Sequence, residues 1–308
     1  MDQIELTASD GVAIACYQWL LDSPRAVVQI AHGMGEHAQR YDWVAQQLNA
    51  AGFAVYANDH RGHGGTAERR SNEPVWGYMG PDGWNRTLAD MYELNRQARQ
   101  EQAGLPLILL GHSMGAMLSQ QYITRYPASI DALALSGSPG FKTGFATFIT
   151  RALGHIESKR LGPDQASEVL QNMLFGNANK PFDGPQASGF EWLSRDPEQV
   201  RRYVEDDACG FVLTTGSLLD MSYGTRQAQD KRHLAKAGAE LPLYVMSGVD
   251  DPVHGEQKDI HRMLMAFTDA GLAAPQVQWY AGGRHEMFNE TNRDEVVRDL
   301  VSWIDKVI

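Results

Sequence analysis

The sequence predicts an α/β fold, built on a mostly parallel sheet of eight strands with helices on both faces. Short apolar runs alternate along the chain with longer stretches of helical periodicity, which is typical of strands joined by crossover helices. The alternation starts with a hairpin pattern. It breaks once, over residues 139–240, where helical periodicity continues without a convincing buried strand.

The eight strands are expected in a hairpin and in six later runs. The hairpin lies in residues 2–20, where two alternating segments flank the turn Ser9-Asp10-Gly11. The later runs are short and apolar or β-rich, and several of them end in glycine. They span residues 26–31, 52–57, 105–110, 131–135, 241–246 and 276–280.

Helical patterns separate most of these runs. Residues 38–51 and 84–102 each place apolar side chains on one stripe, which predicts amphipathic helices. The last helix is expected to begin near Asn292, a typical N-cap residue, with Glu295 three positions later. Its buried face is expected to carry Val296, Val297, Leu300, Val301 and Ile304.

The break in the alternation predicts an inserted domain. Residues 1–138 and 241–308 are expected to form one α/β core, with residues 139–240 as a helical cap, or lid, between two of its strands. An independent second domain is the alternative. Against it, the chain must return after residue 240 to complete the first sheet.

Charge and composition exclude some classes of partner. The chain has 308 residues, with 27 basic and 38 acidic side chains and a formal net charge of −11. Nucleic acids and anionic membranes attract basic surfaces, so we expect no nucleic-acid partner and at most a transient contact of the cap with a membrane surface. The sequence does not report the oligomeric state.

The N-terminus and the cysteines favour a cytoplasmic protein. Residues 1–5 carry acidic side chains and lack the basic start and apolar stretch of a signal peptide. No apolar run approaches the roughly 20 residues that span a bilayer. Cys16 and Cys209 are expected to be free thiols, although a single bond between them is compatible with the sequence.

The strongest functional signal is the segment Gly111-His112-Ser113-Met114-Gly115, which joins an apolar run to a helical pattern. A serine between glycines in a strand–turn–helix context is typical of a nucleophile elbow. The glycines are needed because the strained turn leaves no room for side chains beside the serine backbone. We therefore expect Ser113 to be a nucleophile.

A serine hydroxyl at neutral pH needs a base that is held in place by an acid. His285 follows a glycine turn after the last apolar run and is expected to be the base. Asp250 and Asp251 both follow the run 241–246, and both are candidates for the acid. The ends of these runs meet at one edge of the predicted sheet, so the three groups can come together.

An acyl-transfer intermediate also needs two backbone N–H groups aimed at its oxyanion. One is expected from Met114, immediately after the nucleophile. The other is assigned to Met34 in the loop 31–37, where glycines let the backbone approach a substrate closely.

A group of histidines could suggest a metal site. His32 and His37 are followed later by Asp59-His60-Arg61-Gly62-His63-Gly64. The spacing matches no zinc pattern, and the cysteines lie far away in the sequence. We expect a structural loop beside the active site, no metal, and no other cofactor.

Five segments carry a resemblance to a known family: HGMGEH (32–37), DHRGHG (59–64), GHSMG (111–115), GVDDPV (248–253) and GGRHEMFNE (282–290). Together they resemble the monoacylglycerol lipase and lysophospholipase branch of the α/β-hydrolases. The resemblance covers nearly the whole predicted core, in the right order, and is weak in the cap. It implies an α/β-hydrolase fold and a carboxylesterase that removes one acyl chain from a glycerol or glycerophosphate head. Its pattern implies Ser113 as nucleophile, Asp251 before Pro252 as acid, His285 as base, and Met34 and Met114 as oxyanion positions.

Apolar side chains in the predicted cap are candidates for the wall of an acyl-chain pocket. Packing of the cap helices onto the core explains each of them equally well when taken singly. The candidates are Phe145, Phe148, Ile149, Met173, Leu174 and Phe175.

Other functions are compatible with the same catalytic groups. A thioesterase, an amidase or peptidase, or a carbon–carbon bond hydrolase could use them, since a fold does not determine chemistry. Haloalkane dehalogenases and epoxide hydrolases are disfavoured because they place aspartate where Ser113 stands. A catalytically silent ligand-binding protein usually has a broken triad, whereas every element is present here.

Overall fold

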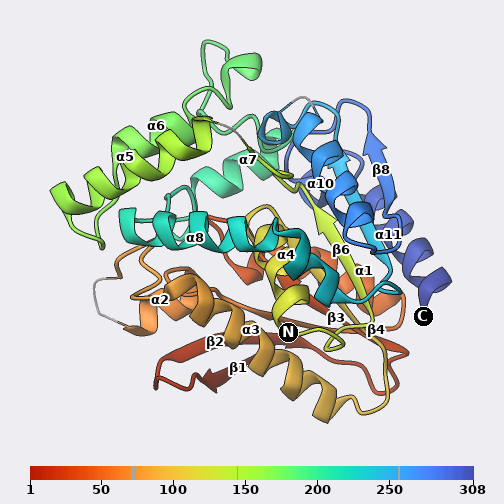
Figure 1. Ribbon diagram of the computed structural model, residues 1–308. Coiled ribbons are helices and arrows are strands. Elements are labelled where there is room, and N and C mark those ends of the chain that lie inside the picture. The colour runs from red at the N-terminus through yellow and green to blue at the C-terminus, as the bar shows by residue number, and fades with distance from the viewer. Residues whose placement is uncertain (71–73, 144, 256) are drawn as a thin grey trace.

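The computed structural model describes residues 1–70, 74–143, 145–255 and 257–308 (Figure 1). Its centre is an eight-stranded sheet with the strand order β1-β2-β4-β3-β5-β6-β7-β8. The pairs β1–β2 and β2–β4 are antiparallel, and all other neighbours are parallel. The predicted fold class, a mostly parallel eight-stranded α/β sheet, is confirmed.

Each predicted run forms a strand, with bounds that differ from the prediction by two residues at most. The five central strands bury every one of their residues, because helices cover both faces of the sheet. The strands are β1 (Asp2–Thr7), β2 (Ala13–Trp19), β3 (Ala26–Ala31), β4 (Phe53–Asn58), β5 (Leu107–His112), β6 (Ala132–Ser136), β7 (Leu243–Gly248) and β8 (Gln276–Tyr280).

Two hydrophobic cores lie on opposite faces of the sheet (Figure 1). One contains the apolar faces of α1 (Asp42–Ala50) and α11 (Arg293–Val307). The other contains those of α3 (Gly83–Glu101), α4 (Met114–Arg125) and α10 (Lys258–Asp269). Shorter helical segments of the core are η1 (Ala38–Tyr41), α2 (Gly64–Arg70), η4 (Pro252–His254) and η5 (Met287–Asn289).

The last helix begins where the sequence predicts, but its capping differs. The Asn292 amide donates to the Glu295 carboxylate at 2.8 Å and accepts no bond from a helix N–H. Asn292 has φ −107° and ψ 27°, outside the extended conformation of most N-caps, so the predicted side-chain cap is wrong. The predicted face is buried at Val296, Val297, Leu300 and Ile304, whereas Val301 is half-buried.

Between β6 and β7 the described chain is helical and contains no strand. Helix α8 lies against α3 and α4: its Asp220 carboxylate accepts the Gly83 N–H at 2.9 Å, and Gly224 adjoins the Trp84 ring. Helices α5 and α6 lie side by side outside α8 (Figure 1). The segments are α5 (Phe145–Leu161), α6 (Glu168–Phe175), η2 (Lys180–Phe182), α7 (Pro197–Val204), α8 (Thr215–Ala228), α9 (Lys231–Leu234) and η3 (Ala235–Ala237).

The predicted division into a core and a cap at residues 139–240 stays a prediction. Within the described ranges, no helix is long and apolar enough to cross a membrane. Cys16 and Cys209 are both free thiols.

Candidate active site

Ser113 stands on a strained turn between β5 and α4. Its φ of 51° and ψ of −112° are rare for a residue with a side chain. A Cβ added at Gly115 would overlap the Ala31 carbonyl oxygen, and one at Gly111 would lie 2.5 Å from Ser119 Oγ. The two glycines therefore let α4 start directly against β3, with the serine at the tip of the turn.

The His285 side chain lies between Ser113 and Asp251. Its Nε2 is 2.9 Å from Ser113 Oγ, and its Nδ1 is 2.9 Å from Asp251 Oδ2. The three residues follow β5, β7 and β8, whose carboxyl ends lie at one edge of the parallel sheet. His285 and Asp251 are buried, while Ser113 is half-buried and can meet a substrate.

This geometry suits proton transfer from Ser113 to His285. When Nδ1–H donates to Asp251, Nε2 has a free lone pair and accepts the serine hydroxyl. The second carboxylate oxygen, Asp251 Oδ1, accepts the Val253 N–H at 2.8 Å. The acid is thus held through both oxygens, and it fixes the orientation of the imidazole.

At Asp251 and His285, burial and mutual pairing shift the pKa in opposite directions. Burial disfavours the carboxylate of Asp251, but the His285 imidazole outweighs it and lowers the pKa of Asp251 below its ordinary value. Burial also disfavours an imidazolium, but Asp251 outweighs it and raises the pKa of His285. The site is therefore built to keep the acid ionised and to stabilise the proton on the base.

The structure separates the two candidate acids. Asp250 is exposed, and its N–H donates to the Gly283 carbonyl at 2.9 Å. Asp251, the next residue, faces the imidazole. The acid position implied by the family resemblance is therefore the one that the geometry favours.

The oxyanion loop, residues 31–37, passes beside the nucleophile. A Cβ added at Gly33 would lie 3.3 Å from Ser113 Cβ, and the Gly33 N–H donates to the Glu36 carboxylate at 2.5 Å. Met34 is the next residue in this loop, and Met114 directly follows Ser113. Both main chains are thus close to the serine, and their roles as oxyanion donors stay predictions.

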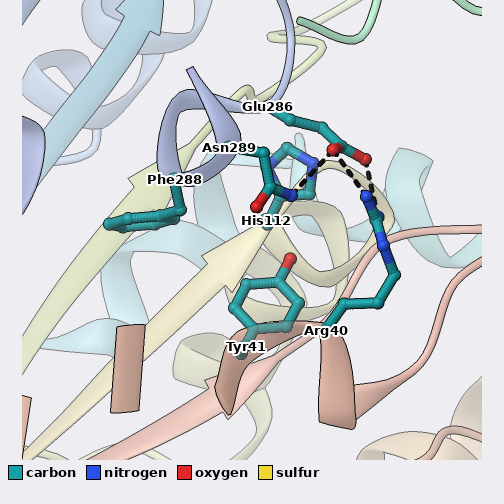
Figure 2. A pocket seen from close by; sticks show the side chains of 6 residues that line it. All are labelled: Arg40, Tyr41, His112, Glu286, Phe288 and Asn289. Carbon is teal, nitrogen blue, oxygen red and sulfur yellow. Dashed lines mark hydrogen bonds and ion pairs between the residues drawn. The ribbon is translucent and has the colours of Figure 1, made fainter. Parts of the chain in front are cut away.

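One guanidinium, that of Arg40, joins the oxyanion loop to the loop that carries His285; Figure 2 shows its contact with Glu286. Arg40 Nη1 donates to Glu36 at 2.6 Å and to Glu286 at 2.7 Å, and its Nη2 donates to Glu286 at 2.8 Å. Burial disfavours both carboxylates, yet Arg40 together with neighbouring groups such as His112 outweighs it and lowers the pKa of each. Because Glu36 holds the oxyanion loop and Glu286 follows His285, Arg40 fixes the two loops relative to each other.

A small cavity lies in this network (Figure 2), with a volume of about 10 Å³, close to that of one water. It is too small for an ester substrate. In its wall, burial and the neighbouring His285 lower the pKa of His112 to about 4, so this imidazole is neutral at pH 7. The lining residues are Arg40, Tyr41, His112, Glu286, Phe288 and Asn289.

A residue of the predicted cap covers the base. The Trp192 ring lies 5.0 Å from the His285 ring, and the Trp192 carbonyl accepts the His285 N–H at 3.3 Å. Phe175 stacks on Trp192 at 6.1 Å. No local pattern marks Trp192 in the sequence, whereas the spacing of Glu36 and Arg40, four residues apart, could have suggested their ion pair.

The structure does not enclose most of the residues proposed for an acyl-chain wall. Phe148, Ile149, Met173 and Leu174 are 60%, 43%, 40% and 38% exposed. Phe175 is half-buried against Trp192, beside the triad. The side chain of Phe145 lies outside the described part of the chain.

The histidine cluster packs inside the core, with the His32 and His60 rings 4.1 Å apart and those of His32 and His63 5.2 Å apart. His32 Nε2 accepts the His60 N–H at 2.9 Å. Burial lowers the pKa of His32 and of His63 to about 3, so both are neutral. Asp59 accepts the Ala38 and Gly65 N–H groups, so the loop is tied together by its own polar groups.

The sheet, the elbow and the serine–histidine–aspartate geometry together define an α/β-hydrolase. The sequence matches the family described as serine aminopeptidase, S33, over residues 22–292. The chain belongs to this family, and its relatives place it in the monoacylglycerol lipase-like branch.

Two relatives and one solved structure illustrate the similarity to this branch of the family. The chain is 33% identical over 298 residues to a monoacylglycerol lipase of Mycolicibacterium smegmatis, covering 96% of this chain and 93% of the relative. It is 30% identical over 310 residues to the monoglyceride lipase of Rattus norvegicus, covering 98% and 90%. The crystal structure of a thermostable carboxyl esterase from Bacillus coagulans superposes with a TM-score of 0.88 at 26% identity, covering 99% of this chain and 98% of that one. The resemblance seen in the motifs is confirmed.

Asparagine substitutions test the assignment of the acid. We expect Asp251→Asn to lower kcat by about 10³–10⁴-fold, because the imidazole loses its orienting carboxylate. The neighbouring change Asp250→Asn should alter kcat less than about threefold, since this side chain is exposed. Initial rates on a p-nitrophenyl ester measure both. Equal and mild effects would place the acid elsewhere.

The pH dependence tests the coupling of His285 to Asp251. Protonated His285 cannot act as a base, so kcat/KM falls on the acid side as this group protonates. Because Asp251 raises the pKa of His285, the midpoint of this fall should lie above 6.5. In Asp251→Asn the raising charge is gone while burial still lowers the pKa, so the midpoint of the residual activity moves to lower pH. An unchanged midpoint would contradict the coupling.

Proposed function

We propose that the chain is a serine carboxyl-ester hydrolase that removes the acyl chain from monoacylglycerols or closely related monoacyl lipids. One observation carries the proposal: His285 lies within hydrogen-bond distance of both Ser113 and Asp251. This arrangement occurs in a chain that matches monoacylglycerol lipases over most of their length. The glycerol in the Bacillus coagulans esterase structure supports a glycerol-bearing substrate.

The reaction proceeds in two steps, through an acyl-enzyme. Ser113 Oγ attacks the ester carbonyl carbon while His285 Nε2 takes the hydroxyl proton. Asp251 stabilises the resulting imidazolium, and the Met34 and Met114 N–H groups donate to the oxyanion. The imidazolium then gives its proton to the departing glycerol oxygen.

Water completes the cycle on the same groups. It attacks the acyl carbonyl as His285 takes one of its protons, and the second oxyanion collapses with release of the fatty acid. The imidazolium returns its proton to Ser113 Oγ. Atoms and charges balance without a cofactor.

We infer that the predicted cap makes a transient contact with lipid surfaces. Exposed apolar side chains mark interaction sites when they gather on one face. The paired helices α5 and α6 lie on the outside of α8 (Figure 1). They carry the exposed side chains of Ile156 (60%) and Val169 (47%). A net charge of −11 leaves apolar insertion, rather than charge attraction, as the driving force.

A second candidate, an aminopeptidase, is favoured by the family description alone. Such an enzyme needs a free carboxylate for the substrate's terminal ammonium. The buried glutamates beside the triad, Glu36 and Glu286, are both paired with Arg40. We therefore rank ester hydrolysis above peptide hydrolysis.

A substrate panel with a nucleophile variant tests the proposed function. Monoacylglycerols and p-nitrophenyl esters should be hydrolysed, and Ser113→Ala should lower kcat by about 10⁴-fold or more. Ser302→Ala is the matched control, because its hydroxyl only donates to the Arg298 carbonyl within α11. Retained activity in Ser113→Ala would refute the nucleophile. Faster turnover of aminoacyl p-nitroanilides than of esters would favour the aminopeptidase.

Substitutions on the outer helices test the lipid contact. The double variant Ile156→Ser with Val169→Ser should bind phosphatidylcholine vesicles about 30-fold more weakly or worse, since each lost insertion forfeits on the order of 1–2 kcal/mol. Its turnover of a water-soluble short-chain ester should be unchanged. Met265→Ser, which removes a side chain 66% exposed on α10, is the control and should not affect sedimentation with vesicles. Equal vesicle binding by all three proteins would contradict the contact.

A further inference from the structure

A cluster of three potential metal ligands lies where the oxyanion loop meets the segment after α7. The cluster comprises His37, Asp206 and Cys209. One ligand atom of each residue lies within 4.8 Å of the other two. His37 ends the oxyanion loop, whereas Asp206 and Cys209 come from the turn that follows Val204. Cys209 lies far from His37 in the sequence, but the fold brings the two side chains together.

Backbone hydrogen bonds already hold the turn in shape. The Cys209 N–H donates to the Asp206 carbonyl at 2.9 Å, and the Gly210 N–H donates to the Gly35 carbonyl of the oxyanion loop at 3.0 Å. The Asp206 side chain is fixed as well, because its Oδ1 accepts the Ala208 N–H at 2.9 Å. Its Oδ2 therefore points to His37 Nε2, 2.9 Å away. The three side chains converge without any rearrangement of the main chain.

The surrounding charges can accommodate a cation. The Arg40 guanidinium acts electrostatically on Cys209, but it is paired with both Glu36 and Glu286, which leaves that group of three with a net negative charge. Burial raises the pKa of the Cys209 thiol, so the sulfur stays protonated unless a cation replaces the proton. His37 helps to lower the pKa of Asp206 against the effect of burial, so this carboxylate is ionised.

We propose that His37, Asp206 and Cys209 bind one zinc ion, or a similarly soft divalent cation, with the fourth position left to water. Thiolate, imidazole and carboxylate are donors that zinc accepts together, whereas magnesium and calcium require oxygen. Zinc bonds of roughly 2.0–2.3 Å place tetrahedral ligands about 3.3–3.8 Å apart. His37 Nε2 and Asp206 Oδ2, which are 2.9 Å apart, therefore separate slightly on binding, while the more distant sulfur moves closer to them.

Binding of the zinc ion releases one proton from the site. The ion takes the sulfur lone pair as the thiol proton leaves to solvent. It also takes the lone pair of His37 Nε2, and the imidazole proton moves to Nδ1. Affinity must therefore fall as the pH is lowered. The bound ion links the turn 206–209 directly to the loop that carries Met34, and it stabilises the native chain by mass action.

Cobalt titration tests the site on the full chain, freed of any affinity tag and of metal. Cobalt(II) reports on sulfur ligation through a thiolate-to-metal charge-transfer band. We expect the wild type to bind one equivalent with this band, and zinc to displace it. Cys209→Ala should lose the band and bind zinc at least tenfold more weakly by calorimetry, and His37→Gln and Asp206→Asn should weaken binding in the same sense.

Each variant has a matched control elsewhere in the chain. Cys16→Ala removes the other thiol, Asp207→Asn the exposed neighbouring acid, and His155→Gln an exposed imidazole. These three should bind as the wild type does, and zinc should raise their unfolding temperatures but not that of Cys209→Ala. Circular dichroism without metal establishes that each variant is folded. A wild type without the charge-transfer band, or equal zinc affinity in the wild type and Cys209→Ala, would overturn the proposal.

Discussion

The whole site depends on the backbone of Ser113, held in a conformation that costs on the order of 1–3 kcal/mol. Its neighbours impose that conformation. The Ser113 N–H donates to the Ser136 carbonyl of β6 at 3.0 Å, and its own carbonyl accepts the Met117 N–H at 3.2 Å. Strands β5 and β6 are completely buried, so the turn cannot relax without disturbing the centre of the sheet. The strain is the condition for lifting the hydroxyl to the imidazole.

Around this turn, the charged groups are kept ionised by pairing against the effect of burial. Asp251 is paired with His285, while Glu36 and Glu286 share Arg40. Removing one member would leave its partner buried and uncompensated, which is costly. The two groups are also mechanically linked, since Glu286 is the neighbour of His285 in the chain. The position of the His285 imidazole is therefore set from two sides, by Asp251 and by the Arg40 network.

The sequence predicts features that depend on residues close together in the chain, and it misses contacts between residues that are far apart in the chain. The strands were predictable because central strands buried on both faces must be continuous apolar runs, and Ser113 because its turn requires glycines on both sides. Asp250 and Asp251 look alike locally; the family resemblance implies Asp251, and the position of His285 beside it separates the two by geometry. Trp192 reaches the base through tertiary packing that leaves no periodic trace. The contact of Cys209 with His37 also leaves no trace in the sequence, because the two residues are 172 positions apart in the chain.

The described contacts fasten the segment 190–211 to the loops that carry His285 and the predicted oxyanion donors. Arg195 donates to the fully buried Glu290, and Arg284 donates to the Ser194 carbonyl, both beside His285. On the other side, the Arg40 guanidinium lies 4.7 Å from the centre of the Tyr203 ring. A movement of this segment would therefore disturb the triad itself. The outer pair α5 and α6 carries exposed apolar side chains instead, but α6 is also coupled to the site, because Phe175 at its end stacks on Trp192, whose ring lies beside that of His285.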